Sequence, residues 1–275
     1  MSRPFLKMNG AGNDFVVVDA RSQPFAPEPA QVRAIANRAG PSGCDQLIAI
    51  EPSVRADAFM RIWNNQGGEV DACGNATRCV GWLLLEETKS DHVTVETNAG
   101  LLHIARAGHE KVTVDMGQPR LEWFQIPLSR PMDTASLDLF AEPDLAMPGA
   151  VNMGNPHVVF FVTDVESFPC DHTGPRIEHH DLFPEGVNVG FAEIKSRDRI
   201  RLRVWERAAG LTKACGTGAC AALVAAHRRG LTDRKATVDV DGGEMTIEWR
   251  ESDGHVLMTG PVEFEFNGVL ATADA

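Results

Sequence analysis

Residues 71–76 read Asp-Ala-Cys-Gly-Asn-Ala, and residues 213–218 read Lys-Ala-Cys-Gly-Thr-Gly. The cysteines of these two stretches, Cys73 and Cys215, lie 142 positions apart in a chain of 275 residues. Each is followed by a run of small and apolar residues that is typical of a buried helix. The two stretches therefore predict a duplicated fold, in which each half presents one thiol at the start of a central helix.

Further pairs of residues recur at the same spacing. They are Trp63 with Trp205, Asn13 with Asn155, Gln46 with Asn188, and Asn64 with Glu206. Packing alone would retain matched apolar residues, whereas three of these four pairs are polar in both halves. The pattern favours a shared binding or catalytic site over a shared core. Thiols retained only for packing, or joined in a reversible disulfide switch, are the alternative interpretations.

Composition narrows the classes of function. The formal net charge of −12 argues against a nucleic-acid or anionic-membrane partner. No apolar run approaches the roughly 18 residues of a membrane span, and the first residues lack the apolar stretch of a signal peptide. We therefore expect a cytoplasmic protein. The six cysteines form no C-x-x-C pair, so we expect free thiols and no metal site.

The pattern of strands and helices is the same in both halves. Alternating or apolar runs predict strands at 15–19, 46–50, 58–63, 92–97, 101–106 and 111–116, and again at 157–162, 188–194, 200–205, 236–240, 245–250 and 262–266. The central helices are expected from Gly74 to about Glu87 and from Gly216 to about Arg229, where Gly230 ends the second one. We predict an α/β (α+β) fold of two pseudo-symmetric duplicated domains, each with strands wrapped around a buried helix.

The expected domain boundaries follow from this repeat. The first domain is predicted to span 1–117 and the second 118–261, with a C-terminal strand in 262–275 returning to the first domain. The active site is expected at the domain interface, where the two helix starts could meet.

A helix start has unpaired N–H groups and a partial positive charge. We therefore expect the pKa of each cysteine thiol to be lowered, so that thiolate forms near neutral pH. The same N–H groups can hold a carboxylate, and Gly74 and Gly216 let a ligand approach the backbone. The side chains of Asn75 and Thr217 add hydrogen-bond donors.

Two opposed thiols can invert a stereocentre without a cofactor. One thiolate removes the proton from the α-carbon of an amino acid, and the opposite thiol donates a proton to the other face. A general base alone contributes only about 10²–10⁴-fold. The charge that grows on the carboxylate must therefore be stabilised by preorganised dipoles.

Six ordered motifs resemble the diaminopimelate epimerase family. They are Met8 to Phe15 (MNGAGNDF), Asp71 to Asn75 with Arg78 and Cys79, Gly154 to His157 (GNPH), Val187 to Gly190 (VNVG), Glu206-Arg207, and Ala214 to Cys220 (ACGTGAC). The resemblance implies reversible conversion of LL-diaminopimelate to the meso form in the lysine and peptidoglycan-precursor pathway. It also implies two α/β domains, Cys73 and Cys215 as the acid/base pair, neither pyridoxal phosphate nor metal, and a homodimer.

The resemblance also implies which residues hold the substrate. The distal amino-acid end and the reacting amine would be held by Asn13, Gln46, Asn64, Asn155, Asn188, Glu206 and Arg207, and the reacting carboxylate by Gly74, Asn75, Gly216 and Thr217. Arg207 can pair bidentately with a carboxylate, and Glu206 can accept from an ammonium, although an adjacent Glu-Arg is often a surface pair. His157 is expected to tune a thiol or bind substrate, with a structural histidine as the alternative.

The chain departs from the family pattern at Ala76 and Ala208, where glycine is common, and at Leu211, where an acidic residue often stands. These changes concern loop conformation. Proline racemase-like enzymes and phenazine-type isomerases share the fold. The former usually carry His where this chain has Asn75, and the latter lack the paired cysteines. A non-enzymatic thiol redox protein is the remaining alternative.

Overall fold

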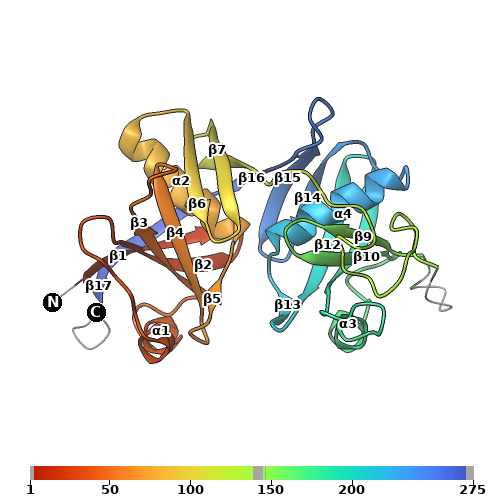
Figure 1. The fold of residues 1–275 in the computed structure, drawn as a ribbon, viewed down its shortest axis with the longest axis horizontal. Helices are drawn as coiled ribbons and strands as arrows, with labels where there is room; N and C mark the ends of the chain where they lie inside the picture. The colour runs from red at the N-terminus through yellow and green to blue at the C-terminus, as the bar shows by residue number, and fades with distance from the viewer. Residues whose placement is uncertain (1–2, 139–144, 146, 271–275) are drawn as a thin grey trace. The chain divides into compact units, whose positions relative to one another are not determined.

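A computed structural model describes residues 3–138, 145 and 147–270 (Figure 1). The chain divides into two compact units. Unit 1 comprises Met1–Val114 and Thr259–Ala275, and unit 2 comprises Asp115–Met258. Residues 271–275, which belong to the predicted C-terminal strand, lie outside the described residues. No helix in the described ranges is both long and apolar enough to cross a membrane.

Unit 1 is a set of strands with two helices. Its elements are β1 (Arg3–Gly10), β2 (Asn13–Asp19), α1 (Pro29–Ala36), β3 (Gln46–Glu51), β4 (Ala58–Asn64), β5 (Glu69–Val70), α2 (Gly74–Thr88), β6 (His92–Thr97), β7 (Gly100–Gly108), β8 (Lys111–Asp115) and β17 (Glu263–Leu270). Strand β1 pairs antiparallel with both β2 and β17. The pairs β2–β3 and β4–β6 are parallel, whereas β3–β4 and β6–β7 are antiparallel.

Unit 2 repeats this order. Its elements are β9 (Gly149–Asn152), β10 (Pro156–Phe161), α3 (Cys170–Glu178), β11 (Asn188–Ser196), β12 (Arg199–Glu206), β13 (Gly210–Thr212), α4 (Gly216–Arg228), β14 (Lys235–Val240) and β15 (Gly243–Trp249), followed by β16 (Val256–Pro261). The pairs β10–β11 and β12–β14 are parallel, whereas β11–β12 and β14–β15 are antiparallel. The pairing pattern is therefore that of unit 1.

The duplication extends to the register of single residues. Phe15 pairs with Gln46 and His157 with Asn188, while Leu47 pairs with Trp63 and Val189 with Trp205. Each pair in unit 2 lies 142 positions beyond its counterpart in unit 1. The predicted α/β fold of two duplicated halves is confirmed.

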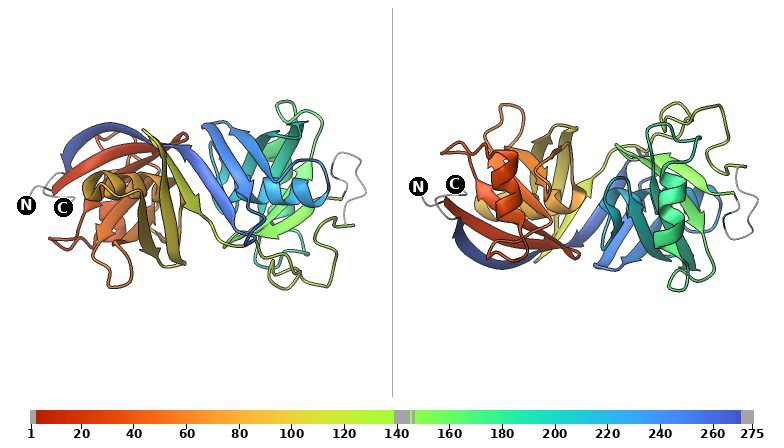
Figure 2. Two further views of the ribbon diagram at one scale, coloured as in Figure 1. Left: turned by 90° about the horizontal axis from the view of Figure 1, so that it is seen from above. Right: turned by 90° about the horizontal axis from the view of Figure 1, so that it is seen from below.

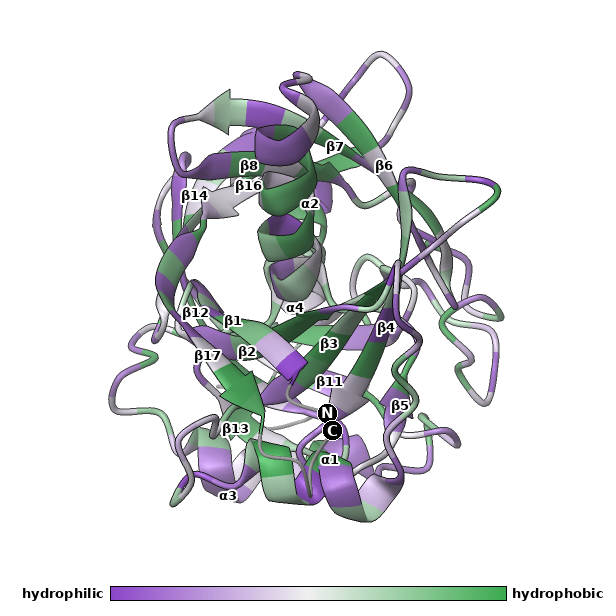
Figure 3. Ribbon diagram, turned by 90° about the vertical axis from the view of Figure 1, so that its left-hand side faces the viewer, coloured by the Kyte–Doolittle hydropathy of each residue, from purple (hydrophilic) through white to green (hydrophobic). Residues whose placement is uncertain are grey.

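The helix that follows each cysteine is largely buried among the strands of its own unit. In α4, ten of the thirteen residues are buried, because alanine, glycine and cysteine occupy most of its circumference. Helix α2 is likewise mostly apolar (Figure 3) and buries ten of its fifteen residues. Gly230 has a φ of 71°, the left-handed conformation that glycine adopts after the end of a helix.

Two short helices were not predicted. Helix α1 packs against β3, and α3 packs against β11, β12 and β13, so each lies over strands of its own unit (Figure 2). In α1 only Val32, Ile35 and Ala36 are buried, too few for a clear helical period. Helix α3 contains Pro175 after Gly174, two residues that the sequence pattern associates with turns.

Candidate active site

Both cysteines occupy the N-cap position of their helix. Cys73 has φ −145° and ψ 110°, and Cys215 has φ −129° and ψ 107°. Neither makes a side-chain cap hydrogen bond in the described structure, and neither helix has an acidic residue in its first turn. The start of each helix thus presents backbone N–H groups with no carboxylate in its own first turn, which suits it to an anionic ligand.

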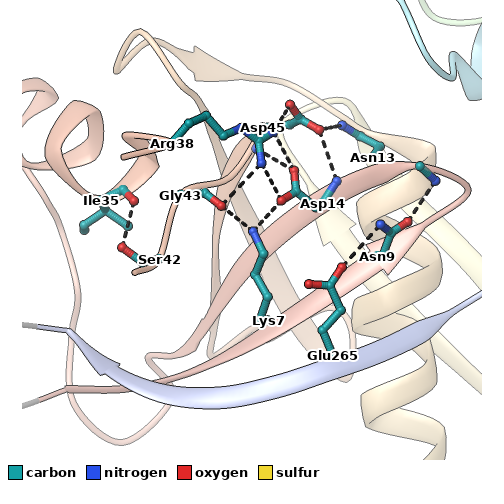
Figure 4. A network of polar contacts seen from close by, with 11 residues as sticks. Lys7, Asn9, Asn13, Asp14, Ile35, Arg38, Ser42, Gly43, Asp45 and Glu265 are labelled. Atoms are coloured by element: carbon teal, nitrogen blue, oxygen red, sulfur yellow. Dashed lines mark hydrogen bonds and ion pairs between the residues drawn. The ribbon is translucent and has the colours of Figure 1, made fainter. Parts of the chain in front are cut away.

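The Cys73 thiol is half-buried and faces an asparagine. Its Sγ lies 3.9 Å from Oδ1 of Asn13. Figure 4 shows that Nδ2 of the same amide donates to Oδ2 of Asp45, at 3.0 Å. A carboxylate only accepts hydrogen bonds, so Asp45 fixes the orientation of the amide. The oxygen of Asn13 is thereby directed at the sulfur.

Asp45 is itself held by a network of charges (Figure 4). Arg38 contacts the carboxylates of Asp45 and Asp14, and Lys7 donates to Asp14 and to the carbonyl of Gly43, both at 2.5 Å. Burial opposes a charge on Asp14, but hydrogen bonds from Arg38 and Lys7 outweigh it and hold its pKa well below the usual range. The network contains two cations and two carboxylates and is close to neutral.

Three more predicted residues of unit 1 lie around the β3–β4 pair and the start of α2. Gln46 faces Asn64 across the two strands. The carbonyl oxygen of the Asn64 amide accepts from the N–H groups of Gln66 and Gly68, so Asn64 holds its own loop. Oε1 of Gln46 and Oδ1 of Asn75 are buried, and neither has a hydrogen-bond partner within the described residues. These two oxygens are candidates for contact with a ligand.

A chain of contacts runs from His157 to Cys215 in unit 2. Nε2 of His157 lies 3.0 Å from Oδ1 of Asn155 and 3.0 Å from Oγ1 of Thr217, whose hydroxyl is 3.6 Å from Sγ of Cys215. Burial, together with the charge of Arg207, lowers the pKa of His157 to about 3. His157 is therefore a neutral imidazole at physiological pH. It positions Thr217 and Asn155 and does not act as a cation.

Cys215 also lies against Glu206. The thiol donates a hydrogen bond to the Glu206 carboxylate, which also accepts from Oγ1 of Thr212 at 2.6 Å. Burial raises the pKa of Cys215 well above its ordinary value, and the charge of Glu206 raises it further. Hydrogen bonds from Thr217 and the N–H of Gly218 act in the opposite direction but are outweighed. The prediction that a helix start lowers the pKa of this thiol is wrong for Cys215, because desolvation and the neighbouring carboxylate exceed the helix contribution.

Asn188 and Arg207 complete the polar cluster of unit 2. Asn188 donates to the carbonyl of Pro156 and accepts from the backbone N–H of Arg207, each at 2.9 Å. Nη1 of Arg207 donates to the carbonyl of Glu185 at 2.8 Å. A cavity of about 490 Å³ within unit 2 is bounded by Arg207 and Asn155, with Arg120 and Glu185 also in its wall.

A profile of known sequences decides the family. The diaminopimelate epimerase profile matches residues 5–122 and 149–265. The chain belongs to the diaminopimelate epimerase family. A diaminopimelate epimerase of Phenylobacterium zucineum is 64% identical over 273 residues, which cover 98% of each chain. Those of Caulobacter sp. strain K31 and Acidiphilium cryptum are 58% and 56% identical over at least 98% of each chain.

Solved structures resemble the fold at much lower sequence identity. A hydroxyproline epimerase from Agrobacterium vitis superposes with a TM-score of 0.69 at 18% identity, over 98% of this chain and 91% of that one. A PhzF-family phenazine biosynthesis protein from Bacillus anthracis gives 0.70 at 16% identity, over 98% and 99%. At such identities the likeness concerns the fold shared with the diaminopimelate epimerase family, and not the activity.

The residues that the family resemblance implies are divided between the two units. Unit 1 contains Asn13, Gln46, Asn64, Cys73, Gly74 and Asn75, and unit 2 contains Asn155, His157, Asn188, Glu206, Arg207, Cys215, Gly216 and Thr217. Sequence reasoning missed Asp45, which accepts from Asn13, and Arg120, which lines the cavity. It also missed Glu178, which binds Trp205 and Ala208 on either side of Glu206 and Arg207. No group of three or more His, Cys, Asp or Glu side chains within the described ranges is arranged to hold a metal ion.

Proposed function

We propose that this chain is a diaminopimelate epimerase, which converts LL-diaminopimelate reversibly to meso-diaminopimelate for lysine and peptidoglycan precursors. The support is its family membership over nearly the whole chain, together with one structural observation. The two cysteines that recur in the duplicated sequence both stand at the N-cap of a buried helix, in backbone conformations that differ by only 16° in φ and 3° in ψ.

The proposed reaction is proton exchange at one α-carbon. In one direction the thiolate of Cys73 takes the α-proton, and the electrons of the C–H bond move into the carboxylate. The thiol of Cys215 then donates its proton to the opposite face of the carbon. The stereocentre is inverted, Cys73 ends as a thiol and Cys215 as a thiolate, and the reverse reaction exchanges their roles. All electrons stay in the substrate and in the two sulfurs, so we propose that neither cofactor nor metal takes part.

The helix starts supply the stabilisation that the thiols cannot. Raising the acidity of the substrate's α-carbon by ten orders of magnitude requires about 14 kcal/mol. A general base alone accelerates proton transfer only about 10²–10⁴-fold. We propose that the N–H groups at Gly74, Asn75, Gly216 and Thr217 hold the reacting carboxylate as its charge grows. Such preorganised donors act at the atoms where charge develops.

The remaining polar residues are assigned to the two amino groups and the distal carboxylate. Glu206 is proposed to accept from the reacting ammonium, because its carboxylate already contacts Cys215. Arg207, in the wall of the cavity, is proposed to pair with the distal carboxylate. Asn13, Gln46, Asn64, Asn155 and Asn188 are proposed to contact the substrate ends, and His157 to orient Thr217. We further propose a cytoplasmic homodimer.

The test is incubation of the reduced protein with LL-diaminopimelate in deuterated water. We expect α-deuteration and formation of the meso isomer, with no reaction of proline in a parallel incubation. Cys73→Ala and Cys215→Ala should each abolish net epimerisation, while Cys44→Ala, at a buried thiol outside the proposed site, should retain it. Turnover near that of the unmodified protein in either active-site variant would refute the two-base assignment. Absence of exchange, together with a reversible Cys73–Cys215 disulfide as the functional state, would instead support the redox alternative.

A further inference from the structure

One recurring residue has no part in the proposed chemistry. Trp205 repeats Trp63 at the spacing of 142 positions, yet neither ring lies among the proposed ligand donors. In unit 2 the indole Nε1 of Trp205 donates to Oε2 of Glu178 at 2.7 Å. Glu178 is the last residue of α3, and it is only 5% exposed. Its carboxylate is therefore almost fully enclosed in unit 2, although Nε2 of the exposed His179 lies 3.9 Å from its Oε1.

Glu178 makes a second contact on the other side of the site residues. Its Oε1 accepts from the backbone N–H of Ala208 at 2.9 Å. Trp205 and Ala208 flank Glu206 and Arg207 in the chain. The two oxygens of one carboxylate thus hold both ends of the segment that carries these residues. The backbone N–H of Arg207 is held in addition by Asn188.

Ala208 needs such an anchor. Its φ is 60°, a left-handed conformation that glycine adopts readily and alanine resists. A hydrogen bond to a charged acceptor is roughly twice as strong as one between neutral groups. Glu178 therefore offsets the strain that alanine introduces.

The clamp that Glu178 forms on Trp205 and Ala208 is present in unit 2 alone. The residue 142 positions before Glu178 is Ala36, which has no side-chain acceptor. Trp63 packs edge-on against Phe25 instead, with ring centroids 6.3 Å apart. Unit 2 is also the unit whose segment carries a carboxylate in contact with the reacting thiol. The clamp is therefore found in the unit where a carboxylate, that of Glu206, must be held next to a thiol.

We propose that Glu178 is a positioning residue, which holds Glu206 against Cys215 and Arg207 at the cavity by fixing the Trp205–Ala208 segment. The proposal rests on the proposed function for its effect on turnover. Its effect on the Cys215 thiol requires only the contacts in unit 2. A carboxylate accepts both N–H groups, whereas a glutamine amide can accept only one and must direct its NH₂ at the other.

The test is Glu178→Gln. We expect kcat/KM to fall about tenfold through displacement of the site residues, and the pH midpoint of Cys215 alkylation, followed on its peptide by mass spectrometry, to fall because Glu206 moves away. Glu193→Gln is the matched control, since Glu193 also accepts a backbone N–H, from Val165 at 3.2 Å. It should leave both quantities unchanged.

Adding Trp205→Phe to Glu178→Gln gives the decisive comparison. Phenylalanine removes the indole N–H, so the oxygen of the introduced amide can face Ala208 without its NH₂ opposing a second donor. The double variant should recover kcat/KM and the alkylation midpoint relative to E178Q. The proposal is overturned if E178Q behaves as the unmodified protein, if the double variant is no better than E178Q, or if both variants fail to fold. Because the alkylation midpoint needs no substrate, it tests the clamp even if diaminopimelate is not turned over.

Discussion

Replacing Gly218 with alanine would move the Cys215 sulfur without removing any polar group. Gly218 is the third residue of α4. A Cβ at this position would lie 3.2 Å from both Cβ and Sγ of Cys215 and 3.0 Å from Cγ2 of Val204. The equivalent residue of unit 1 is Ala76, the third residue of α2. The two halves therefore differ in the space they leave beside the thiol.

The expected effects of Gly218→Ala on stability and on kcat have different physical causes and can be estimated separately. Overpacking costs about 1–3 kcal/mol, while alanine gains about 1 kcal/mol over glycine in a helix, so the net loss of stability is about 0–2 kcal/mol. The new contacts require the sulfur to move by a few tenths of an ångström. Since a misplacement of about 1 Å can cost about 10²-fold, a shift of roughly half that size corresponds to about tenfold in kcat.

The assay is the initial rate of α-deuterium incorporation from diaminopimelate, with thermal denaturation measured on the same preparations. Ala76→Gly is the matched control. It should cost about 1 kcal/mol of stability through helix propensity and leave kcat near that of the unmodified protein. A folded Gly218→Ala enzyme with the full rate, or an equal loss of activity in Ala76→Gly, would contradict a displacement of the Cys215 sulfur.

Three further predictions concern titration. Folded His157 stays neutral down to a pKa of about 3, whereas an unfolded histidine binds a proton below about pH 6.5. Stability should thus fall by about 1.4 kcal/mol per pH unit as the pH drops through this window, and His157→Gln should flatten that slope in urea titrations. Glu206→Gln should lower the pH midpoint of Cys215 alkylation, and an unchanged midpoint would contradict the contact. Asp45→Asn should free the side-chain amide of Asn13 to turn its NH₂ toward Cys73, and so lower the pH midpoint of Cys73 alkylation. In an Asn13→Ala background, Asp45→Asn should change that midpoint little.

The sequence predicts the central helices well because their signal is local. A helix that is small and apolar around its circumference must be buried, and the Cys-Gly start and Gly230 mark its ends. The strands likewise show alternation or apolar runs. Helix α1 gives no clear signal because only three of its residues are buried, and α3 gives none because Gly174 and Pro175 are residues typical of turns. Their positions do match at the spacing of 142 residues, since Pro29–Ala36 corresponds to 171–178, but their residue types do not.

The candidate site is only partly readable from the chain. The N-cap cysteines follow from local sequence, but the pKa of Cys215 does not, because burial and Glu206 outweigh the effect of the helix start. The carboxylate beside Cys215 comes from Glu206, nine positions earlier, and only the return of the chain through β13 brings the two together. Asp45 and Glu178 act through contacts with Asn13 and Ala208, and neither has an equivalent acidic residue in the other half to reveal it.

Duplication and later divergence explain why the two thiols are equivalent in backbone but not in surroundings. A reversible epimerase starts each cycle with one thiolate and one thiol. Two identical sites would give neither sulfur a preference for either state. Here burial and Glu206 hold Cys215 as a thiol, which suits it to donate the proton in the first step of the proposed reaction and leaves Cys73 to serve as the base in that direction. In unit 2 the clamp on the Trp205–Ala208 segment holds Glu206 next to Cys215. In unit 1 the charge network around Asp45 orients Asn13 next to Cys73.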